Sequence, residues 1–313
     1  MCSETVQAML PSSGAAPAAC LSLATARWMN VRMKRLGRLS GWFASALLAA
    51  ACGAPQVAWP PLPPVQPAPD WDTAQRPIII GHRGASDAYA PENTMPAFDI
   101  AANCGAAIET DIQTSADGIP VLIHDDDTLR TTGKPGKVAV LPASVLRQRS
   151  AAALTATPAA FVPIPLLQEY LARYAGHSLL APEIKAGDMV AIVRQLRVVA
   201  PRGVLVHSFG EGQLQRAREL APELRLELDS SERVPIQRLA ALGVWSIGLW
   251  YEQVTVDYVA ACHELGIRVI AWTVNDLAIA RRLVTELHVD GIVTDNPAML
   301  VRALHGDQQA LAP

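Results

Sequence analysis

The stretch AIETDIQTSADGIPVLIH, residues 107–124, holds two strand-like runs on either side of Asp117-Gly118. An Asp-Gly pair between such runs is a strong signal for a two-residue hairpin loop. In that register Ala116 pairs with Ile119 and Asp111 lies opposite His124, with about 5 Å between their Cβ atoms. The stretch therefore predicts an antiparallel hairpin that brings a histidine beside a carboxylate.

Around this hairpin, short apolar runs alternate with amphipathic, helix-like segments. The predicted strands are 78–81, 107–113, 121–124, 179–184, 204–208, 225–228, 246–249, 268–273 and 291–294. The predicted helices are 94–104, 166–174, 189–199, 213–220, 235–242, 256–265, 277–286 and 297–304.

Treating 121–124 as an attached return strand leaves eight β–α repeats over about 230 residues, close to the roughly 250 of a TIM-type barrel. We therefore predict an α/β fold, a (β/α)₈ barrel over residues 77–307 with a small hairpin insertion after the second strand. A doubly wound open sheet is the alternative. It lacks its usual support, because no GxGxxG or Walker sequence follows the first strand.

Composition narrows the function classes. The 313 residues carry a formal net charge of −3 and no basic run in the predicted domain, which argues against a nucleic-acid-binding surface. The five cysteines include no CxxC pair, so neither a zinc site nor a disulfide framework is indicated. Cys104 and Cys262 fall on predicted helices and are expected to be small core residues.

The N-terminal region reads as targeting sequence. Residues 33–52 contain a basic segment, the apolar run 41–51 and then Cys52, the order found in a bacterial signal peptide. The sequence before Cys52 resembles a lipoprotein signal, so Cys52 is a candidate lipidation site. We expect an exported, periplasmic protein whose membrane contact is an N-terminal lipid anchor, in the outer rather than the inner membrane.

The other flanking segments are expected to lie outside the barrel. Residues 1–32 have no targeting pattern and are interpreted as an upstream extension, and 308–313 as a tail. Prolines crowd residues 53–76, which predicts a semi-rigid spacer without core residues.

Polar side chains gather at the C-terminal ends of the early predicted strands, where barrels place their active sites. These residues are His82, Arg83, Glu109, Asp111, His124, Glu183 and Lys185. Three carboxylates facing one cavity repel each other, and a hard cation that prefers oxygen ligands, Mg²⁺, Ca²⁺ or Mn²⁺, removes that cost. The alternative is an ionic network with Arg83 and Lys185. Among the remaining histidines, His207 is a weaker candidate for the cavity, and the others are expected at the surface.

A series of motifs resembles the glycerophosphodiester phosphodiesterase family. In family order they are Gly81-His82-Arg83-Gly84, Pro91-Glu92-Asn93-Thr94, Glu109-Thr110-Asp111, Asp117-Gly118, His124-Asp125, Glu183-Ile184-Lys185, Ala271-Trp272-Thr273-Val274-Asn275 and Thr294-Asp295. They span nearly all of the predicted domain.

The resemblance implies a TIM-type barrel, one divalent cation and release of glycerol 3-phosphate and an alcohol. It implies Glu109, Asp111 and Glu183 as metal ligands and Arg83 and Lys185 as phosphate-binding residues. His82 and His124 would form the acid/base pair, with His124 assigned as the acid and His82 as the base.

Trp272 is either a substrate-binding wall or core packing, and the attacking oxygen is either water or a glycerol hydroxyl. Two rival functions remain: cleavage of intact lipids by a phospholipase-like activity, and a non-catalytic envelope lipoprotein that binds glycerophosphodiesters or another partner.

Overall fold

The computed structural model describes residues 59–86, 90–153, 161–198 and 201–306. The predicted upstream extension, signal peptide, Cys52 and C-terminal tail lie outside these ranges. Among the described residues, none of the helices has the length and apolar character needed to cross a bilayer.

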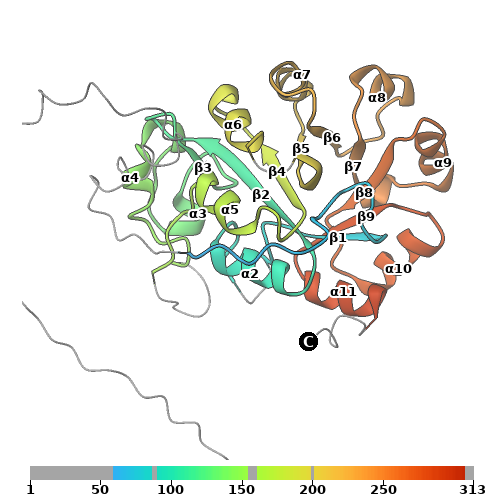
Figure 1. The fold of residues 1–313 in the computed structure, drawn as a ribbon, viewed down its shortest axis with the longest axis horizontal. Helices are drawn as coiled ribbons and strands as arrows, with labels where there is room; N and C mark the ends of the chain where they lie inside the picture. Colours follow the sequence, from blue (N-terminus) through green and yellow to red (C-terminus); the bar gives the residue numbers. More distant parts are fainter. Residues whose placement is uncertain (1–58, 87–89, 154–160, 199–200, 307–313) are drawn as a thin grey trace, which may run out of the picture. The chain divides into compact units, whose positions relative to one another are not determined.

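The described strands form one sheet that closes on itself (Figure 1). They are β1 (Ile78–Gly81), β2 (Ala107–Thr114), β3 (Pro120–Leu122), β4 (Leu180–Ile184), β5 (Leu205–Ser208), β6 (Arg225–Ser230), β7 (Ser246–Trp250), β8 (Arg268–Trp272) and β9 (Gly291–Thr294). Pairing runs β1-β9-β8-β7-β6-β5-β4-β2, and β1 also pairs with β2. All these pairs are parallel, and β3 is attached to β2 in the antiparallel sense. The predicted (β/α)₈ barrel with its hairpin attachment is confirmed.

Helices connect the strands and cover the outside of the ring (Figure 1). The main ones are α2 (Met95–Asn103), α5 (Leu167–Tyr174), α6 (Met189–Leu196), α7 (Glu211–Leu220), α8 (Ile236–Leu242), α9 (Val256–Glu264), α10 (Leu277–Thr285) and α11 (Pro297–His305). Shorter turns are α3 (Leu129–Thr132), η1 (Val138–Val140), α4 (Ala143–Leu146), η2 (Pro201–Gly203) and η3 (Tyr251–Gln253). Apolar side chains buried between the helices and the strands form the largest of three apolar cores among the described residues.

The hairpin differs from the prediction by one residue. Gln113 pairs with Val121, and Ser115 N–H donates to the carbonyl of Ile119 at 3.0 Å. The loop therefore has three residues, and Gly118 closes it with φ +76°, a conformation that favours glycine. The two-residue loop is wrong, and so is the direct pairing of Asp111 with His124, because Ile123 N–H donates to the carbonyl of Asp111.

A second apolar core fills the barrel interior. It consists of Trp71, Ile78, Ile80, Ala107, Ala181, Leu205, Ile270 and Val293. Trp71 is fully buried, and its indole N–H donates to the carbonyl of Gly203 at 3.2 Å. The prediction that residues 59–76 form a spacer without core residues is therefore wrong, because Trp71 in this segment belongs to the barrel core. The prolines near Trp71 favour an extended backbone, but burial of the large indole ring stabilises the packing of this segment against the barrel.

Candidate active site

His82 directly follows β1, and its side chain is hydrogen-bonded to a carboxylate that follows β9, the strand that pairs with β1. Its Nδ1 lies 2.6 Å from Oδ1 of Asp295, the residue after β9. Asp295 also accepts hydrogen bonds from Ser86 and Asn275, each at 2.6 Å. Burial opposes a charge on His82, but the bond to Asp295 and the charge of Glu109 outweigh it and raise the pKa of His82. With Nδ1 engaged, Nε2 is left for proton transfer.

Arg83 connects the β1 loop to the carboxylates of β2. Its φ of +51° turns its backbone N–H toward Glu109, which accepts it. The guanidinium donates to Glu92 at 2.8 Å, and its Nε lies 3.5 Å from Asp111 Oδ2. A single loop residue thus binds one carboxylate through its backbone and faces a second through its side chain.

Three buried carboxylates from β2 and β4 meet inside the barrel. Glu109, Asp111 and Glu183 each offer an oxygen, and these atoms lie within 4.8 Å of one another. Burial raises the pKa of Glu109, and it raises that of Glu183 to about 8. For Asp111, Lys185 and Arg83 outweigh burial and hold the pKa low. A converging set of oxygen ligands with unfavourable negative charge fits a hard divalent cation.

Lys185 and His124 complete the polar ring. Lys185 Nζ lies 2.8 Å from Glu183 Oε2 and 3.4 Å from Asp111 Oδ1. His124 Nδ1 lies 2.8 Å from Asp125 Oδ1, and Arg130 braces Asp125 at 2.6 Å. Burial lowers the pKa of His124 despite the carboxylates of Asp111 and Asp125.

The two pKa directions apply to the protein without a cation. They favour a protonated His82 and a neutral His124, the reverse of the acid and base roles expected from the sequence. Part of the rise at His82 comes from Glu109, whose charge a bound cation would neutralise. The assignment of roles therefore stays a prediction.

Asn93 orients Asp111 from the loop before α2. Its Nδ2 donates to Asp111 Oδ2 at 2.7 Å, and its Oδ1 accepts from Thr110 Oγ1 and the Asp111 N–H. The residue has φ +54°, which asparagine tolerates better than most side chains. The next residue, Thr94, provides the N-terminal cap of α2, because its side chain accepts a hydrogen bond from the N–H of Ala97.

The predicted site residues other than Asp111 and Cys52 line one cavity of about 160 Å³. Asp111 lies beside it through its contacts with Arg83 and Lys185. Trp272 forms part of the wall and packs edge-on against Phe209, with ring centroids 5.4 Å apart. The lining of the cavity therefore combines charged and aromatic side chains, and Lys185 Nζ lies 5.7 Å from the centroid of the Phe209 ring.

Comparison with known proteins identifies the family of the chain. Residues 82–299 match the model of the Glycerophosphoryl diester phosphodiesterase family. The chain belongs to this family.

Relatives in the glycerophosphodiester phosphodiesterase family match most of the chain. The glycerophosphodiester phosphodiesterase of Bacillus altitudinis is 30% identical over 240 residues, with 72% of this chain and 96% of that protein covered. The enzyme of Caldanaerobacter subterraneus subsp. tengcongensis is 28% identical over 235 residues, with the same shares covered. The predicted enzyme class is confirmed.

A solved phosphodiesterase from Oleispira antarctica, in complex with the product sn-glycerol-3-phosphate, has a similar fold. It superposes with a TM-score of 0.65 at 29% identity, covering 72% of this chain and 96% of that one.

Five residues around the site were missed or undervalued in the sequence. Asn93 and Asp295 stand just before the predicted helices 94–104 and 297–304, where the sequence alone suggests helix caps, and His207 was only a weaker candidate for the cavity. Glu227 and Asp229 were missed, although Leu-Glu-Leu-Asp in β6 has the same two-residue spacing as Glu109 and Asp111 in β2. All three residues on β5 and β6 line the cavity.

His207 belongs to a second group of possible ligands with Glu183 and Asp229. Both of its ring nitrogens are already engaged: Nδ1 lies 2.7 Å from Asp229 Oδ2, and Nε2 lies 3.0 Å from the carbonyl of Ala181. A carbonyl only accepts, so Nε2 carries a proton. His207 therefore acts here as a buried cation that balances carboxylates and not as a metal ligand.

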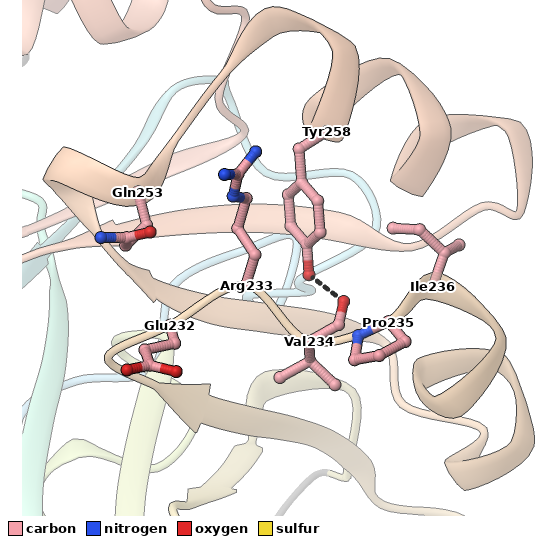
Figure 2. Close-up of a pocket in the computed structure, with 7 residues that line it drawn as sticks. All are labelled: Glu232, Arg233, Val234, Pro235, Ile236, Gln253 and Tyr258. Atoms are coloured by element: carbon pink, nitrogen blue, oxygen red, sulfur yellow. Dashed lines mark hydrogen bonds between the residues drawn. The ribbon is translucent and has the colours of Figure 1, made fainter.

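A wider, open hollow of about 570 Å³ lies on the surface between the β6–α8 loop and α9 (Figure 2). Tyr258 donates to the carbonyl of Val234 across it at 2.8 Å, and its ionisable side chains include Glu232 and Arg233. None of the predicted site residues lines this hollow.

Proposed function

We propose that the protein hydrolyses glycerophosphodiesters to glycerol 3-phosphate and an alcohol, with a divalent cation and the pair His82 and His124. One observation carries the proposal. Two histidines, each tied through Nδ1 to a carboxylate, line the same cavity as Arg83, Lys185 and buried carboxylates.

The cation would be held by Glu109, Asp111 and Glu183, and their oxygen chemistry suits Mg²⁺ or Ca²⁺, with Mn²⁺ also compatible. When bound, it supplies positive charge that stabilises the charge developing on phosphate oxygens. The raised pKa values of Glu109 and Glu183 support this assignment, because a cation would remove the repulsion that burial creates.

The side chains of the cavity divide the remaining work. Arg83 and Lys185 bind phosphate oxygens and reduce the repulsion that the diester's negative charge exerts on a nucleophile. One histidine takes a proton from the attacking oxygen, and the other donates a proton to the leaving alkoxide. The attacking oxygen is water or a glycerol hydroxyl, and detection of a cyclic phosphate in a single turnover separates the two routes.

The test is release of glycerol 3-phosphate from glycerophosphocholine by the purified full chain, with and without EDTA. We expect release that requires the cation and that His82→Ala and His124→Ala each abolish. His288→Asn is the matched control, because His288 is an exposed histidine with φ +59°, which asparagine accommodates. Absence of release with Mg²⁺, Ca²⁺ or Mn²⁺ and several head groups would refute the proposal.

Cleavage of intact lipids is the second candidate, because apolar side chains are exposed in the segment after His124. Leu129 is 52% exposed, Val140 72% and Phe161 44%. Assays on vesicles of phosphatidylcholine would show whether this surface serves lipid substrates. Activity on vesicles that exceeds activity on glycerophosphocholine would favour this candidate.

We also propose export with lipidation at Cys52, on the charge and hydropathy pattern of residues 33–52. Metabolic labelling with a fatty acid should mark the protein, and Cys52→Ser should remove the label and release the protein from membranes. Labelling that survives Cys52→Ser would contradict the anchor.

A further inference from the structure

Two buried carboxylates on β6 have no part in the mechanism above. Glu227 is 4% exposed and Asp229 is 6% exposed, and both line the same cavity as Glu183 and Trp272. Burying a carboxylate is costly unless its oxygens find partners. Their presence at the cavity wall therefore calls for a partner that the cavity receives.

Each carboxylate uses one oxygen within the protein and leaves the other free. Glu227 Oε2 accepts from Ser246 Oγ, and Asp229 Oδ2 is bonded to His207. Across the described residues, Glu227 Oε1 and Asp229 Oδ1 have no hydrogen-bond partner, and neither atom is sealed from the cavity. Two acceptor atoms of the wall are thus open to a ligand.

Gly248 on β7 makes room for both free oxygens. A Cβ added at Gly248 would lie 2.2 Å from Asp229 Oδ1 and 3.0 Å from Glu227 Oε1. The two acceptors therefore converge on one small space. Such spacing suits two neighbouring hydroxyl groups, each donating one hydrogen bond of about 2.7 Å.

The charges around the cavity favour a neutral ligand group at this position. Counted as ionised, Glu109, Asp111, Glu183, Glu227 and Asp229 are balanced by Arg83, Lys185, protonated His207 and one divalent cation. No surplus negative charge remains to attract an ammonium group or a second metal ion. A second metal would also have to displace the hydrogen bond from His207 Nε2 to the carbonyl of Ala181.

Hydroxyl groups can donate hydrogen bonds, so they match a wall that presents two free acceptors. The indole nitrogen of Trp272 is buried and, within the described ranges, has no hydrogen-bond partner, but it is closed off from the cavity and supplies no donor there.

We propose that Glu227 and Asp229 bind the hydroxyl groups of the glycerol end of the substrate and so determine its selectivity for glycerol. This inference rests on the proposed function. A site built to bind hydroxyl groups discriminates strongly against an analogue that lacks them, because its buried acceptors are then left unpaired.

The test compares two ligands that share a phosphate but differ in hydroxyl groups. Binding of glycerol 3-phosphate and of propyl phosphate to the full chain with Mg²⁺ is measured by isothermal titration calorimetry. We expect Glu227→Gln and Asp229→Asn each to weaken glycerol 3-phosphate roughly 10- to 100-fold and to leave propyl phosphate nearly unchanged. Glu232→Gln, in the exposed hollow after β6, should alter neither.

Unchanged glycerol 3-phosphate affinity in both variants, or an equal loss for both ligands, would overturn the assignment. Propyl phosphate binding shows in each variant that the site is still folded. Tighter binding of choline or of a second Mg²⁺ by the wild type than by the variants, with no change for glycerol 3-phosphate, would also overturn it. If the wild type binds glycerol 3-phosphate selectively but cleaves no glycerophosphodiester, the proposed function fails and the hydroxyl-binding site stands.

Discussion

His82 and Asp295 lie 213 residues apart in the chain, and their side chains meet at 2.6 Å where the barrel closes. The backbone makes this contact possible, because β1 pairs with β9 and His82 N–H donates to the carbonyl of Thr294 at 2.8 Å. Closure of the barrel therefore also orients a histidine of the proposed acid/base pair.

Asp295→Asn should impair catalysis through His82. Loss of the carboxylate lowers the pKa of His82, because the bond to Asp295 is the largest factor that raises it. We expect kcat/KM to fall roughly 100-fold or more, within the range that acid–base catalysis contributes. The pH–rate profile of the metal-loaded enzyme is the measurement. If His82 is the base, the acidic limb moves to lower pH.

Asp125→Asn is the matched experiment on His124, whose Nδ1 is bonded to Asp125. The hydrogen bond to Asp125 raises the pKa of His124, so loss of the Asp125 carboxylate should lower it. If His124 is the acid, the alkaline limb of the pH–rate profile should then move to lower pH. The opposite pattern, with Asp295→Asn moving the alkaline limb, would exchange the two roles. No movement of either limb would argue against catalysis by these histidines.

Replacing Asn93 should weaken cation binding without touching a ligand. Asn93 donates to Asp111 Oδ2 at 2.7 Å, and loss of such an orienting partner typically costs about 10- to 100-fold in metal affinity or activity. Titration of activity with Mg²⁺ should show this loss in both Asn93→Ala and Asn93→Gly. Glycine accepts φ +54° without strain, so recovery of affinity in Asn93→Gly alone would assign the effect to the backbone.

The sequence predicted most of the scaffold and the strand-end chemistry for physical reasons. Buried parallel strands appear in the sequence as apolar runs, and amphipathic helices show a period of about 3.6 residues. The order of strands and helices can therefore be predicted from short stretches of sequence. The reactive residues sit at or just after strand ends, where chain direction alone gathers them. The hairpin register was wrong because a three-residue loop depends on the left-handed conformation of Gly118, which Asp-Gly permits but does not specify.

Contacts between segments that are distant in the chain could not be predicted from the sequence. Asp295 and Asn93 look like ordinary helix caps, and only the closed barrel shows that they hold His82 and Asp111. Asp229 was missed: the sixth strand was predicted to end at 228, so this residue fell outside it, whereas β6 extends to Ser230. The burial of Trp71 was not predicted, because the surrounding prolines suggested a spacer.

Without a cation, the protein should lose stability as pH rises from about 5 to 8. Burial raises the pKa of Glu183 and Glu227 from 4.5 to about 8, so between these values the folded state holds protons that the unfolded chain has released. Stability therefore falls with rising pH across this window. Melting temperatures in EDTA at pH 6 and pH 8 test this.

Mg²⁺ should offset that loss, and its stabilising effect should be larger at pH 8, where fewer protons compete for Glu183. Glu227→Gln should reduce the pH dependence in EDTA while keeping the effect of Mg²⁺. Equal stabilisation by Mg²⁺ at pH 6 and pH 8 would contradict a cation held by Glu183.

Trp71→Ala should be strongly destabilising although it lies far from the catalytic end. Trp71 is fully buried in the barrel core and stacks edge-on with Trp245 at 5.8 Å, so its truncation should cost about 3–5 kcal/mol in free energy of unfolding. Trp59→Ala is the control, since Trp59 is only partly buried, and we expect a loss of about 1–2 kcal/mol. Urea denaturation of the two variants measures both. Equal losses of stability in the two variants would mean that residues 59–76 stabilise the barrel without a special role for Trp71. A smaller loss for Trp71→Ala than for Trp59→Ala would contradict the role of Trp71 as a core residue of the barrel.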